Sequence, residues 1–366
     1  MTNFKIQKLK ISNFRNLEDT VISFNSGINC IFGQNGNGKT NILEAIYIIA
    51  NKKSFRKNST FPQYLSINGE KPEIIFSSVF HNQNKELVSY SIRQNIQEMV
   101  YSLNGQIIKK KLDIKTVFIN PFDSYSFHND ASERREFFDH YLSLLDSDYK
   151  NDLKKYKQSL KFKNILLAKK PSLFLEQIKA IDPEISQYAY KLNQRRILFL
   201  QELEKFFEEN FKNIFSEEHS LKLKLESKIN GMNAIQIQEA LKNNLSKDLE
   251  RGTSTLGPHR DDYLLLFDSI NSYDFCSLGQ QKMAYLSLLF AYIDVFRYKY
   301  MSYPIVLIDD VSGELDQNRW RRLVDYLEKR DFQVLITTAN EKFKEELDRI
   351  QGANKIYVDN GSIKNC

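Results

Sequence analysis

The sequence predicts an α/β fold in which a mixed sheet flanked by helices is divided by a long helical insertion. Three observations lead to this prediction. Near residue 33 a short apolar segment, a glycine-rich loop and a helix-like segment follow one another. Between Gly105 and Gly231 there is no glycine, and this segment is rich in Leu, Phe, Lys and Glu. After Gly257 strand-like and helix-like segments alternate again, which is typical of a parallel sheet covered by helices.

The size and composition of the chain set its domain organisation and broad class. With 366 residues it is long enough for two or three domains and a sizeable core. We expect residues 1–125 to form the first half of a nucleotide-binding domain, 126–250 a helical arm, and 251–366 the second half. No apolar run approaches the roughly 20 residues that cross a bilayer. The three cysteines are far apart and lack the spacing of a disulfide framework or a zinc site. These features predict a cytoplasmic protein without membrane attachment.

The first part of the chain is predicted to form strands and one hairpin. Residues 4–32 and 73–108 carry strand-like apolar patterns separated by turn residues. Within the second of these segments, Asn104-Gly105 predicts a two-residue hairpin turn. The basic stretch 52–57, which includes Arg56, indicates either a solvated helix end or a surface that contacts a polyanion.

Residues 33–40 have the spacing of a phosphate-binding loop, Gly-Gln-Asn-Gly-Asn-Gly-Lys-Thr. Glycines let backbone amides approach phosphate oxygens, Lys39 supplies a positive charge, and Thr40 offers a hydroxyl ligand for Mg²⁺. The apolar strand 28–32 before the loop and the helix after it bring a helix N-terminus to the phosphates. We therefore predict a site for a nucleotide with Mg²⁺. Its residues are Gly33, Gln34, Asn35, Gly36, Asn37, Gly38, Lys39, Thr40 and Asn41.

The segment from about residue 130 to residue 250 is predicted to be helical. Apolar residues at helical spacing predict one helix over about 149–170 and another over about 184–215. The first helix carries four lysines on one face, and Asp152 is the only carboxylate within it. A polyanion could lie along this face, which suits the net charge of +6, but an ordinary solvated face has the same pattern. The lysines are Lys150, Lys154, Lys157 and Lys161.

Two acidic residues follow a buried strand in the second half of the chain. The apolar run 305–308 is followed by Asp309 and Asp310. Asp309 is predicted to hold Mg²⁺ opposite Thr40, and Asp310 to orient or deprotonate the attacking water. Successive side chains of a strand point to opposite faces, so both carboxylates reach the phosphates only if the strand ends there. Further strands are predicted at 263–267 and 334–338, and helices at 281–296 and 316–329.

The segment Ser277-Leu278-Gly279-Gln280 marks the start of a predicted helix. Ser277 and Gln280 have the spacing of a capping box, which alone indicates an ordinary helix start. The alternative is an anion-binding helix N-terminus, where Gly279 allows close approach of the backbone. The residues of that site are Ser277, Gly279, Gln280 and Gln281.

Several segments, in this order around a helical insertion, resemble the ABC-type ATPase head of the SMC and RecF kind. They are residues 33–40, 277–281, 308–310 and 312–316. Further segments are similar to those of the RecF family, namely 9–17, 54–56, 133–139 and 257–262. Leu278 departs from the family, in which glutamine is usual. Residues 337–339 lack the histidine of transporter ATPases, so the residue that senses the γ-phosphate is left open.

The resemblance implies an ABC-type P-loop ATPase head with an inserted helical arm. It implies a slow, weak, DNA-stimulated ATPase, in which residues 33–40 of one copy and 277–281 of another clamp ATP in a head-to-head dimer. By motif match, Lys39 contacts phosphate, Asp309 is the magnesium aspartate and Asp310 is the catalytic carboxylate. Asp316 is the residue that contacts the second copy.

The resemblance also implies a role in recombinational repair, DNA replication and the SOS response to DNA damage. The dimer is expected to bind duplex DNA beside single-stranded gaps and to act with RecR, and indirectly with RecO and RecA. The expected DNA contacts are the lysine face of the helix over 149–170, the stretch with Arg56, and the basic residues 109–111.

Two other functions share the phosphate-binding loop. An ABC transporter subunit is disfavoured by the long helical insertion and by the absent histidine at 337–339. A P-loop kinase of a small metabolite would leave residues 277–281 without a role.

Overall fold

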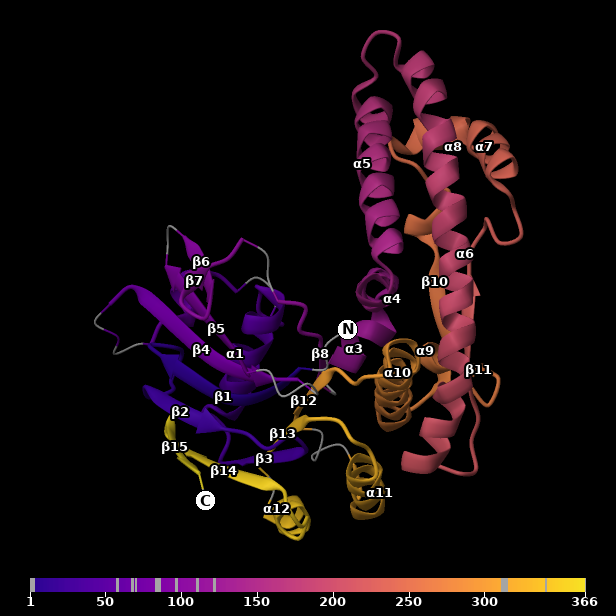
Figure 1. Cartoon of the computed structure of the whole chain (residues 1–366). Helices are drawn as coiled ribbons and strands as arrows, with labels where there is room; N and C mark the ends of the chain where they lie inside the picture. The colour runs from indigo at the N-terminus through magenta and orange to yellow at the C-terminus, as the bar shows by residue number, and fades with distance from the viewer. Residues whose placement is uncertain are drawn as a thin grey trace. The chain divides into compact units, whose positions relative to one another are not determined.

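The computed structural model describes residues 4–56, 59–66, 69, 71–82, 87–95, 98–109, 112–120, 123–310, 315–339 and 341–365 (Figure 1). The chain divides into two compact units. The first unit consists of residues 1–121, 213–215 and 293–366, and the second of residues 122–212 and 216–292. The division into residues 1–125, 126–250 and 251–366 that we expected stays a prediction. Among the described residues, no helix is both long enough and apolar enough to span a membrane.

A largely parallel sheet forms the base of the first unit. The strand order is β15-β14-β3-β13-β12-β8, and only β15 runs antiparallel to its neighbour. All residues of β3 and β13 are buried, as expected for strands that are covered on both faces. The strands are β3 (Ile28–Phe32), β8 (Thr116–Ile119), β12 (Ile305–Asp309), β13 (Val334–Thr338), β14 (Asn354–Asp359) and β15 (Ser362–Asn365).

A second, antiparallel sheet of the first unit has the order β2-β1-β4-β5-β6-β7. In β4 every second residue is buried, which is the pattern of a sheet with one face against a core. Asn104 and Gly105 join β6 to β7 with φ angles of 49° and 81°, so the predicted hairpin turn is confirmed. The strands are β1 (Lys5–Ser12), β2 (Thr20–Ser23), β4 (Glu73–His81), β5 (Leu87–Asn95), β6 (Met99–Leu103) and β7 (Gln106–Ile107).

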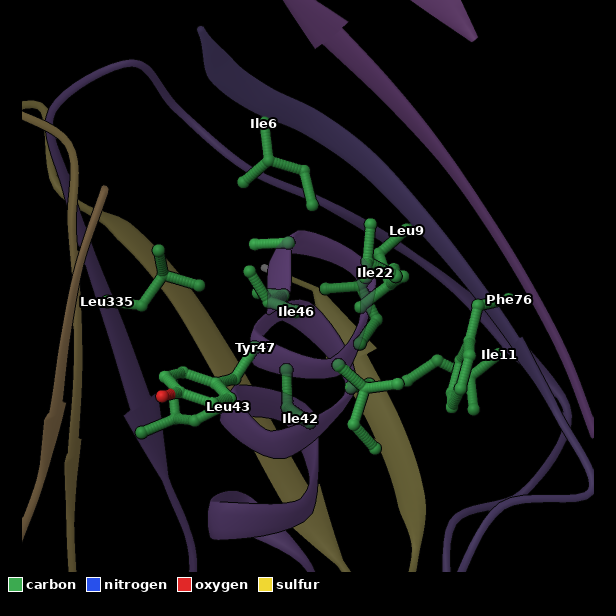
Figure 2. Close-up of a cluster of buried hydrophobic side chains, with 14 of the residues drawn as sticks. Ile6, Leu9, Ile11, Ile22, Ile42, Leu43, Ile46, Tyr47, Phe76 and Leu335 are labelled. Atoms are coloured by element: carbon green, nitrogen blue, oxygen red, sulfur yellow. The ribbon is translucent and has the colours of Figure 1, made fainter. Parts of the chain in front are cut away.

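Helix α1 (Lys39–Asn51) lies between these two sheets (Figure 2). Every residue from Ile42 to Ala50 is buried, because apolar side chains meet it from both sides. Ile6, Leu9, Ile11, Ile22 and Phe76 come from the antiparallel sheet, and Leu335 comes from β13. This packing holds the N-terminus of α1 in place at the edge of the parallel sheet. The other helices of the unit are α2 (Phe61–Tyr64), α11 (Gln317–Glu328) and α12 (Glu341–Asp348).

The second unit is mostly helical, and its helices α5 and α6 run side by side (Figure 1). The predicted helix over 149–170 is confirmed as α5, and its apolar stripe is buried. The helix predicted from about residue 184 is α6, which begins ten residues earlier at Phe174 and continues through Pro183. The helices are α3 (Asp123–Asn129), α4 (Ala131–Leu145), α5 (Ser147–Lys169), α6 (Phe174–Ile214), α7 (Ala234–Asn243), α8 (Leu245–Arg251), α9 (Ser272–Phe275) and α10 (Leu278–Tyr300). The boundaries between the units fall between residues 121 and 122, near the end of α6, and within α10.

Two predictions for this part of the chain were wrong, one about the helical insertion and one about the sheet that residues 263–267 join. The insertion is not wholly helical, because Leu221–Glu226 forms strand β9. Its strict alternation of Leu with Lys or Glu is a period-two signal that the glycine-poor composition concealed. Residues 263–267 do form a strand, β10 (Asp262–Phe267), but it pairs antiparallel with β9 and β11 (Ile270–Asn271) and does not join the parallel sheet.

The buried guanidinium of Arg196 joins several elements of the second unit. Arg196 is 2% exposed and donates to Asp139 Oδ1 at 2.7 Å, Asp261 Oδ2 at 2.7 Å, Pro258 O at 2.8 Å and Tyr149 Oη at 3.0 Å. These partners lie on α4, on α5 and in the segment 257–262. A buried guanidinium needs such partners, because an unpaired buried charge is strongly unfavourable.

The segments 133–139 and 257–262, which were singled out in the sequence, are bound to each other. Arg134 makes a bidentate contact with Asp262 at 2.7 and 2.8 Å, and Arg135 donates to Asp261 O at 2.9 Å. His259 donates from Nε2 to a carbonyl and accepts at Nδ1 from Tyr156 Oη at 2.7 Å, and burial lowers the pKa of His259 to about 4. Both segments therefore contribute hydrogen bonds and ion pairs to the interior of the second unit.

Replacing Arg196 with methionine should leave Asp139 and Asp261 buried without their counter-charge. We expect Arg196→Met to lower the free energy of unfolding by about 3–5 kcal/mol, measured by urea denaturation followed by circular dichroism. The neighbouring Arg195, with a side chain 28% exposed and 3.0 Å from Asp152, provides the control. Arg195→Met should cost about 1 kcal/mol or less. If the two variants lost equal free energy of unfolding, the buried network around Arg196 would contribute no more to stability than the exposed ion pair of Arg195.

Candidate nucleotide-binding site

The predicted phosphate-binding loop lies between the end of β3 and the start of α1 in the first unit. Gly38 is the N-cap residue of α1 and has φ 110°. A Cβ atom at Gly38 would lie 2.7 Å from Leu17 Cδ2 and 2.9 Å from Asn16 Oδ1, so this position requires glycine. Because glycine has no side chain to cap the helix, the first amides of α1 remain available to an anion.

The side chain of Lys39 is folded back onto this loop. Its Nζ donates to Gly33 O at 2.8 Å and to Gln34 O at 3.0 Å, and the residue is 6% exposed. Burial lowers the pKa of Lys39, and the carboxylates of Asp310 and Asp309 oppose this effect. The ammonium group is thus held at the mouth of the loop beside two acidic side chains.

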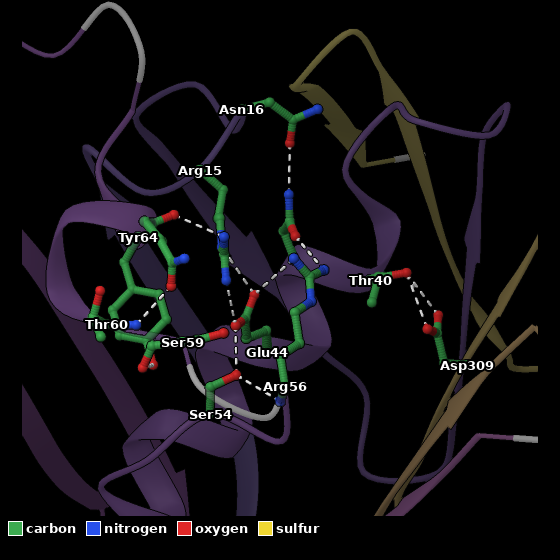
Figure 3. A network of polar contacts seen from close by, with 12 residues as sticks. Arg15, Asn16, Thr40, Glu44, Ser54, Arg56, Ser59, Thr60, Tyr64 and Asp309 are labelled. Carbon is green, nitrogen blue, oxygen red and sulfur yellow. Dashed lines mark hydrogen bonds and ion pairs between the residues drawn. The ribbon is translucent and has the colours of Figure 1, made fainter. Parts of the chain in front are cut away.

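Thr40 and Asp309 meet at the edge of the parallel sheet (Figure 3). Thr40 Oγ1 lies 2.9 Å from Oδ1 and 3.1 Å from Oδ2 of Asp309. Thr337, on the strand between them, donates to Asp309 Oδ1 at 2.9 Å. Burial raises the pKa of Asp309, and hydrogen bonds from Thr337 and Thr40 oppose this effect. The hydroxyl and the carboxylate form an oxygen donor pair that fits Mg²⁺, which prefers such ligands.

Asp310 stands where the backbone leaves the sheet. Strand β12 ends at Asp309, and Asp310 has φ 42°, a left-handed conformation that is uncommon for a residue with a side chain. The strand therefore ends between the two carboxylates, which is the condition for both to serve one site. The negative charge of Asp310 favours the charged form of Lys39 and opposes the lowering of its pKa by burial.

Glu44 is a buried carboxylate on α1 that the sequence interpretation missed (Figure 3). It is 0% exposed and accepts from Arg15 at 2.8 and 3.1 Å and from Ser54 Oγ at 2.6 Å. Arg56 lies 3.5 Å from it. The segments 9–17 and 54–56 thus converge on α1. An acidic residue inside the apolar run 42–50 is the signal that could have revealed this cluster.

Asn16 links this cluster to the phosphate-binding loop. Its Nδ2 donates to Gly36 O at 2.8 Å, and its Oδ1 accepts from Asn41 Nδ2 at 2.7 Å. Arg56 donates to Asn41 Oδ1 at 2.8 Å. The amide of Asn41, predicted to contact the nucleotide, is therefore bound to protein partners. Asn37 is held from the other side, because its Nδ2 donates to a carbonyl of β14.

The predicted loop residues differ in exposure. Lys39 and Gly38 are buried, Gly33, Asn37 and Thr40 are partly exposed, and Gln34, Asn35 and Gly36 are exposed.

The segment 277–281 lies in the second unit and forms the predicted capping box. Ser277 N donates to Gln280 Oε1 at 2.9 Å, and Gln280 N donates to Ser277 Oγ at 3.3 Å. Ser277, Leu278 and Gly279 are exposed, and a Cβ at Gly279 would meet open space. Gln281 differs from them, because it is 8% exposed and its amide donates to the Ser272 carbonyl at 3.0 Å.

The four lysines of α5 are exposed and share one face of the helix. Lys150, Lys154, Lys157 and Lys161 line a shallow groove together with Leu153 and Gln158. Lys157 lies 3.8 Å from Asp139, and its side chain is 64% exposed. The face is therefore cationic and open to a partner.

Asp316 is the N-cap residue of α11. Its carboxylate accepts from the backbone of Arg319 at 2.9 Å, lies 3.1 Å from the Arg319 guanidinium, and is 53% exposed. Other predicted segments lie outside the described residues. They are Lys57 of the stretch 52–57, Lys110 and Lys111 of 109–111, and residues 312–314 of 312–316.

Comparisons with known proteins agree on one family. The family model described as the RecF/RecN/SMC N terminal domain matches residues 5–361. The DNA replication and repair protein RecF of Agathobacter rectalis is 33% identical over 367 residues, covering 98% of each chain. The protein of the same description from Clostridium novyi is 30% identical over 373 residues, covering 98% of this chain and 99% of its own.

Solved structures share the fold. A structure of the recombination mediator protein RecF with ATP in the RecFOR pathway has a TM-score of 0.84 at 23% identity, covering 100% of this chain and 98% of that one. An Smc head domain from Pyrococcus furiosus, with an extended coiled coil and bound to the C-terminal domain of ScpA, has a TM-score of 0.60 at 17% identity. That match covers 99% of this chain and 96% of the Smc chain. At these identities, the two structures support the ABC-type head fold.

The crowding around Gly38 generates a prediction. We expect Gly38→Ala to weaken the binding of a fluorescent ATP analogue by a factor of about 10 to 100, because the new Cβ would displace Leu17 and Asn16 in addition to backbone strain of roughly 1–3 kcal/mol. Gly36 also has positive φ, 87°, but no atom lies within 4 Å of a Cβ placed there. Gly36→Ala should therefore weaken binding less. Equal affinities for the two variants would contradict the steric argument.

Proposed function

The chain belongs to the RecF/RecN/SMC N-terminal domain family, and from that premise we propose that it is an ATP-dependent DNA-binding protein of recombinational repair and DNA replication. The observation that carries this proposal is the meeting of Lys39, Thr40, Asp309 and Asp310 at one edge of the parallel sheet. The RecF relatives of this chain and the RecF–ATP complex of the same fold support ATP as the nucleotide.

In the proposed ATP site, different groups bind the phosphates, hold Mg²⁺ and activate the attacking water. The amides at the start of α1 and the Lys39 ammonium bind the phosphates. Thr40 and Asp309 would hold Mg²⁺, which when bound neutralises charge on the phosphates. Asp310 orients the attacking water and accepts its proton. The product is ADP and phosphate, in a slow reaction that resets the protein.

We propose that the site is completed by a second copy of the chain. Ser277 and Gly279 are exposed and Gln280 is partly exposed at the N-terminus of α10, where backbone amides suit the phosphates bound by the partner copy. Gln281 acts indirectly here, by holding the loop that precedes the helix. Asp316 contributes the exposed part of its carboxylate to the same interface.

The lysine face of α5 is the proposed DNA contact. It offers four exposed ammonium groups along one helix, which suits a phosphate backbone. Arg56 makes a weaker candidate, since its guanidinium already binds Glu44 and Asn41. We expect duplex DNA beside single-stranded gaps to be the substrate, with RecR as a partner and RecO and RecA further along the pathway, in the cytoplasm. The RecFOR description of the structural relative supports this setting.

Two substitutions separate ATP binding from hydrolysis. Lys39→Ala should abolish ATP binding and ATP-dependent dimerisation, because the ammonium group is lost from the loop. Asp310→Asn should keep ATP bound and accumulate the dimer, because the water is no longer activated. Sedimentation velocity with and without ATP measures both effects. The control is Asp331→Asn at a side chain that is 92% exposed. ATP-dependent dimerisation of Lys39→Ala equal to that of the native chain would refute the clamp.

The DNA contacts predict a change in salt dependence. Lys154→Gln with Lys161→Gln should reduce the slope of log K against log salt concentration by about 1.8, or about 0.9 for each lost phosphate contact. Fluorescence anisotropy with gapped DNA measures the slope. Lys222 and Lys224 are exposed lysines of β9 in the same unit, so their double glutamine variant is the matched control. If the slope were unchanged in both double variants, the lysine face of α5 would not be a DNA contact.

A further inference from the structure

Thr337 lies on the strand that separates the two halves of the site. Strand β13 pairs with β3, which leads into the phosphate-binding loop, and with β12, which ends at Asp309. In the register of the sheet, Thr337 is the partner of Asp309 on one side and of Ile31 on the other. It is 0% exposed. A polar side chain at this depth needs hydrogen-bond partners.

The hydroxyl of Thr337 has two partners in the site. It donates to Asp309 Oδ1 at 2.9 Å and accepts from the backbone N–H of Asp310 at 3.1 Å. A hydroxyl group has one proton and two acceptor lone pairs, so both hydrogen bonds form at once. One side-chain atom therefore contacts two consecutive residues for which different tasks are proposed.

The two hydrogen bonds of Thr337 restrict the positions of the Asp309 and Asp310 carboxylates. The first gives the buried Asp309 carboxylate a fixed donor besides Thr40, which restricts its rotation. The second supports Asp310 in its left-handed conformation with φ 42°, which residues with side chains rarely adopt. That conformation ends the strand and sets the direction in which the Asp310 side chain leaves the sheet.

We propose that Thr337 is a positioning residue, whose hydroxyl holds Asp309 and Asp310 in the geometry that ATP hydrolysis requires. The inference rests on the proposed ATPase function and adds to it a residue that acts through Asp309 and Asp310. Valine has nearly the shape of threonine but can neither donate nor accept, so it removes this link and little else.

Two pairs of variants isolate the hydroxyl. Thr337→Val is compared with the native chain, and Thr337→Ala with Thr337→Ser, because the members of each pair differ chiefly in the hydroxyl. Thr116→Val is the matched control. Thr116 is 4% exposed on β8 of the same sheet, and its hydroxyl accepts from Asn51 Nδ2 at 2.8 Å, outside the site.

Three measurements are made on each full-length variant. They are kcat and KM for ATP, the affinity for a fluorescent ATP analogue with and without Mg²⁺, and the midpoint of thermal unfolding. Thr337→Val and Thr337→Ala should lower kcat and the Mg²⁺-dependent gain in affinity by roughly 10- to 100-fold, as for other groups that orient a ligating side chain. Affinity without Mg²⁺ should stay unchanged. Thr337→Ser should restore both quantities, whereas Thr116→Val should shift only the unfolding midpoint.

The outcomes distinguish a failure of the inference about Thr337 from a failure of the proposed ATPase function. If the native chain neither binds nor hydrolyses ATP, the proposed function fails. If the native chain hydrolyses ATP, and the two members of each pair have the same kcat and the same Mg²⁺-dependent gain in affinity, the inference alone is overturned. Losses of kcat in Thr116→Val as large as those in Thr337→Val would also overturn it, because they would reflect a general weakening of the sheet.

Discussion

The hydrogen bond between Thr40 and Asp309 is the contact on which the rest of the site depends. It joins residues that are 269 positions apart in the chain. It forms because β3 and β12 both run parallel to β13, so that their carboxyl ends reach the same edge of the sheet. Helix α1 is packed between two sheets, and this packing keeps Thr40 at that edge. The phosphate loop, the acidic pair and helix α1 are therefore joined by one continuous set of contacts.

A second constraint governs the helical unit. Its elements are tied by Arg196 and its two carboxylates, and by the bidentate pair of Arg134 with Asp262. The segments 133–139 and 257–262 supply the residues of these contacts. Glu44 plays a comparable part beside the phosphate loop, where Arg15, Ser54 and Arg56 converge on it. Buried charge in this protein mainly fixes the relative positions of neighbouring segments.

Local patterns predicted the local parts of this structure. The strand, loop and helix around residues 33–40, the turn at Asn104-Gly105 and the capping box of Ser277 each depend on residues a few positions apart, and the structure confirms these three local features. The pairing of β9 with β10 was missed because strand register is decided between distant segments. The same reason hid Thr337, whose partners become visible only when β13 is known to lie beside β12. The burial of the Gln281 amide, and the use of the Asn41 amide by Asn16 and Arg56, could not be read from a motif that gives only spacing.

The order of the strands also determines when the site can exist during synthesis of the chain. Strand β3 is synthesised early, but it pairs with β13 and β14. Residue 28 therefore has its strand partner only after residue 334 has been added, and residue 29 only after residue 354. The antiparallel sheet, which ends at residue 107, and the whole of the helical unit are complete before then. Closing a loop of this length delays folding. The phosphate loop therefore leaves the ribosome long before its sheet is complete, and the proposed ATP site cannot form until strands β13 and β14 have been synthesised.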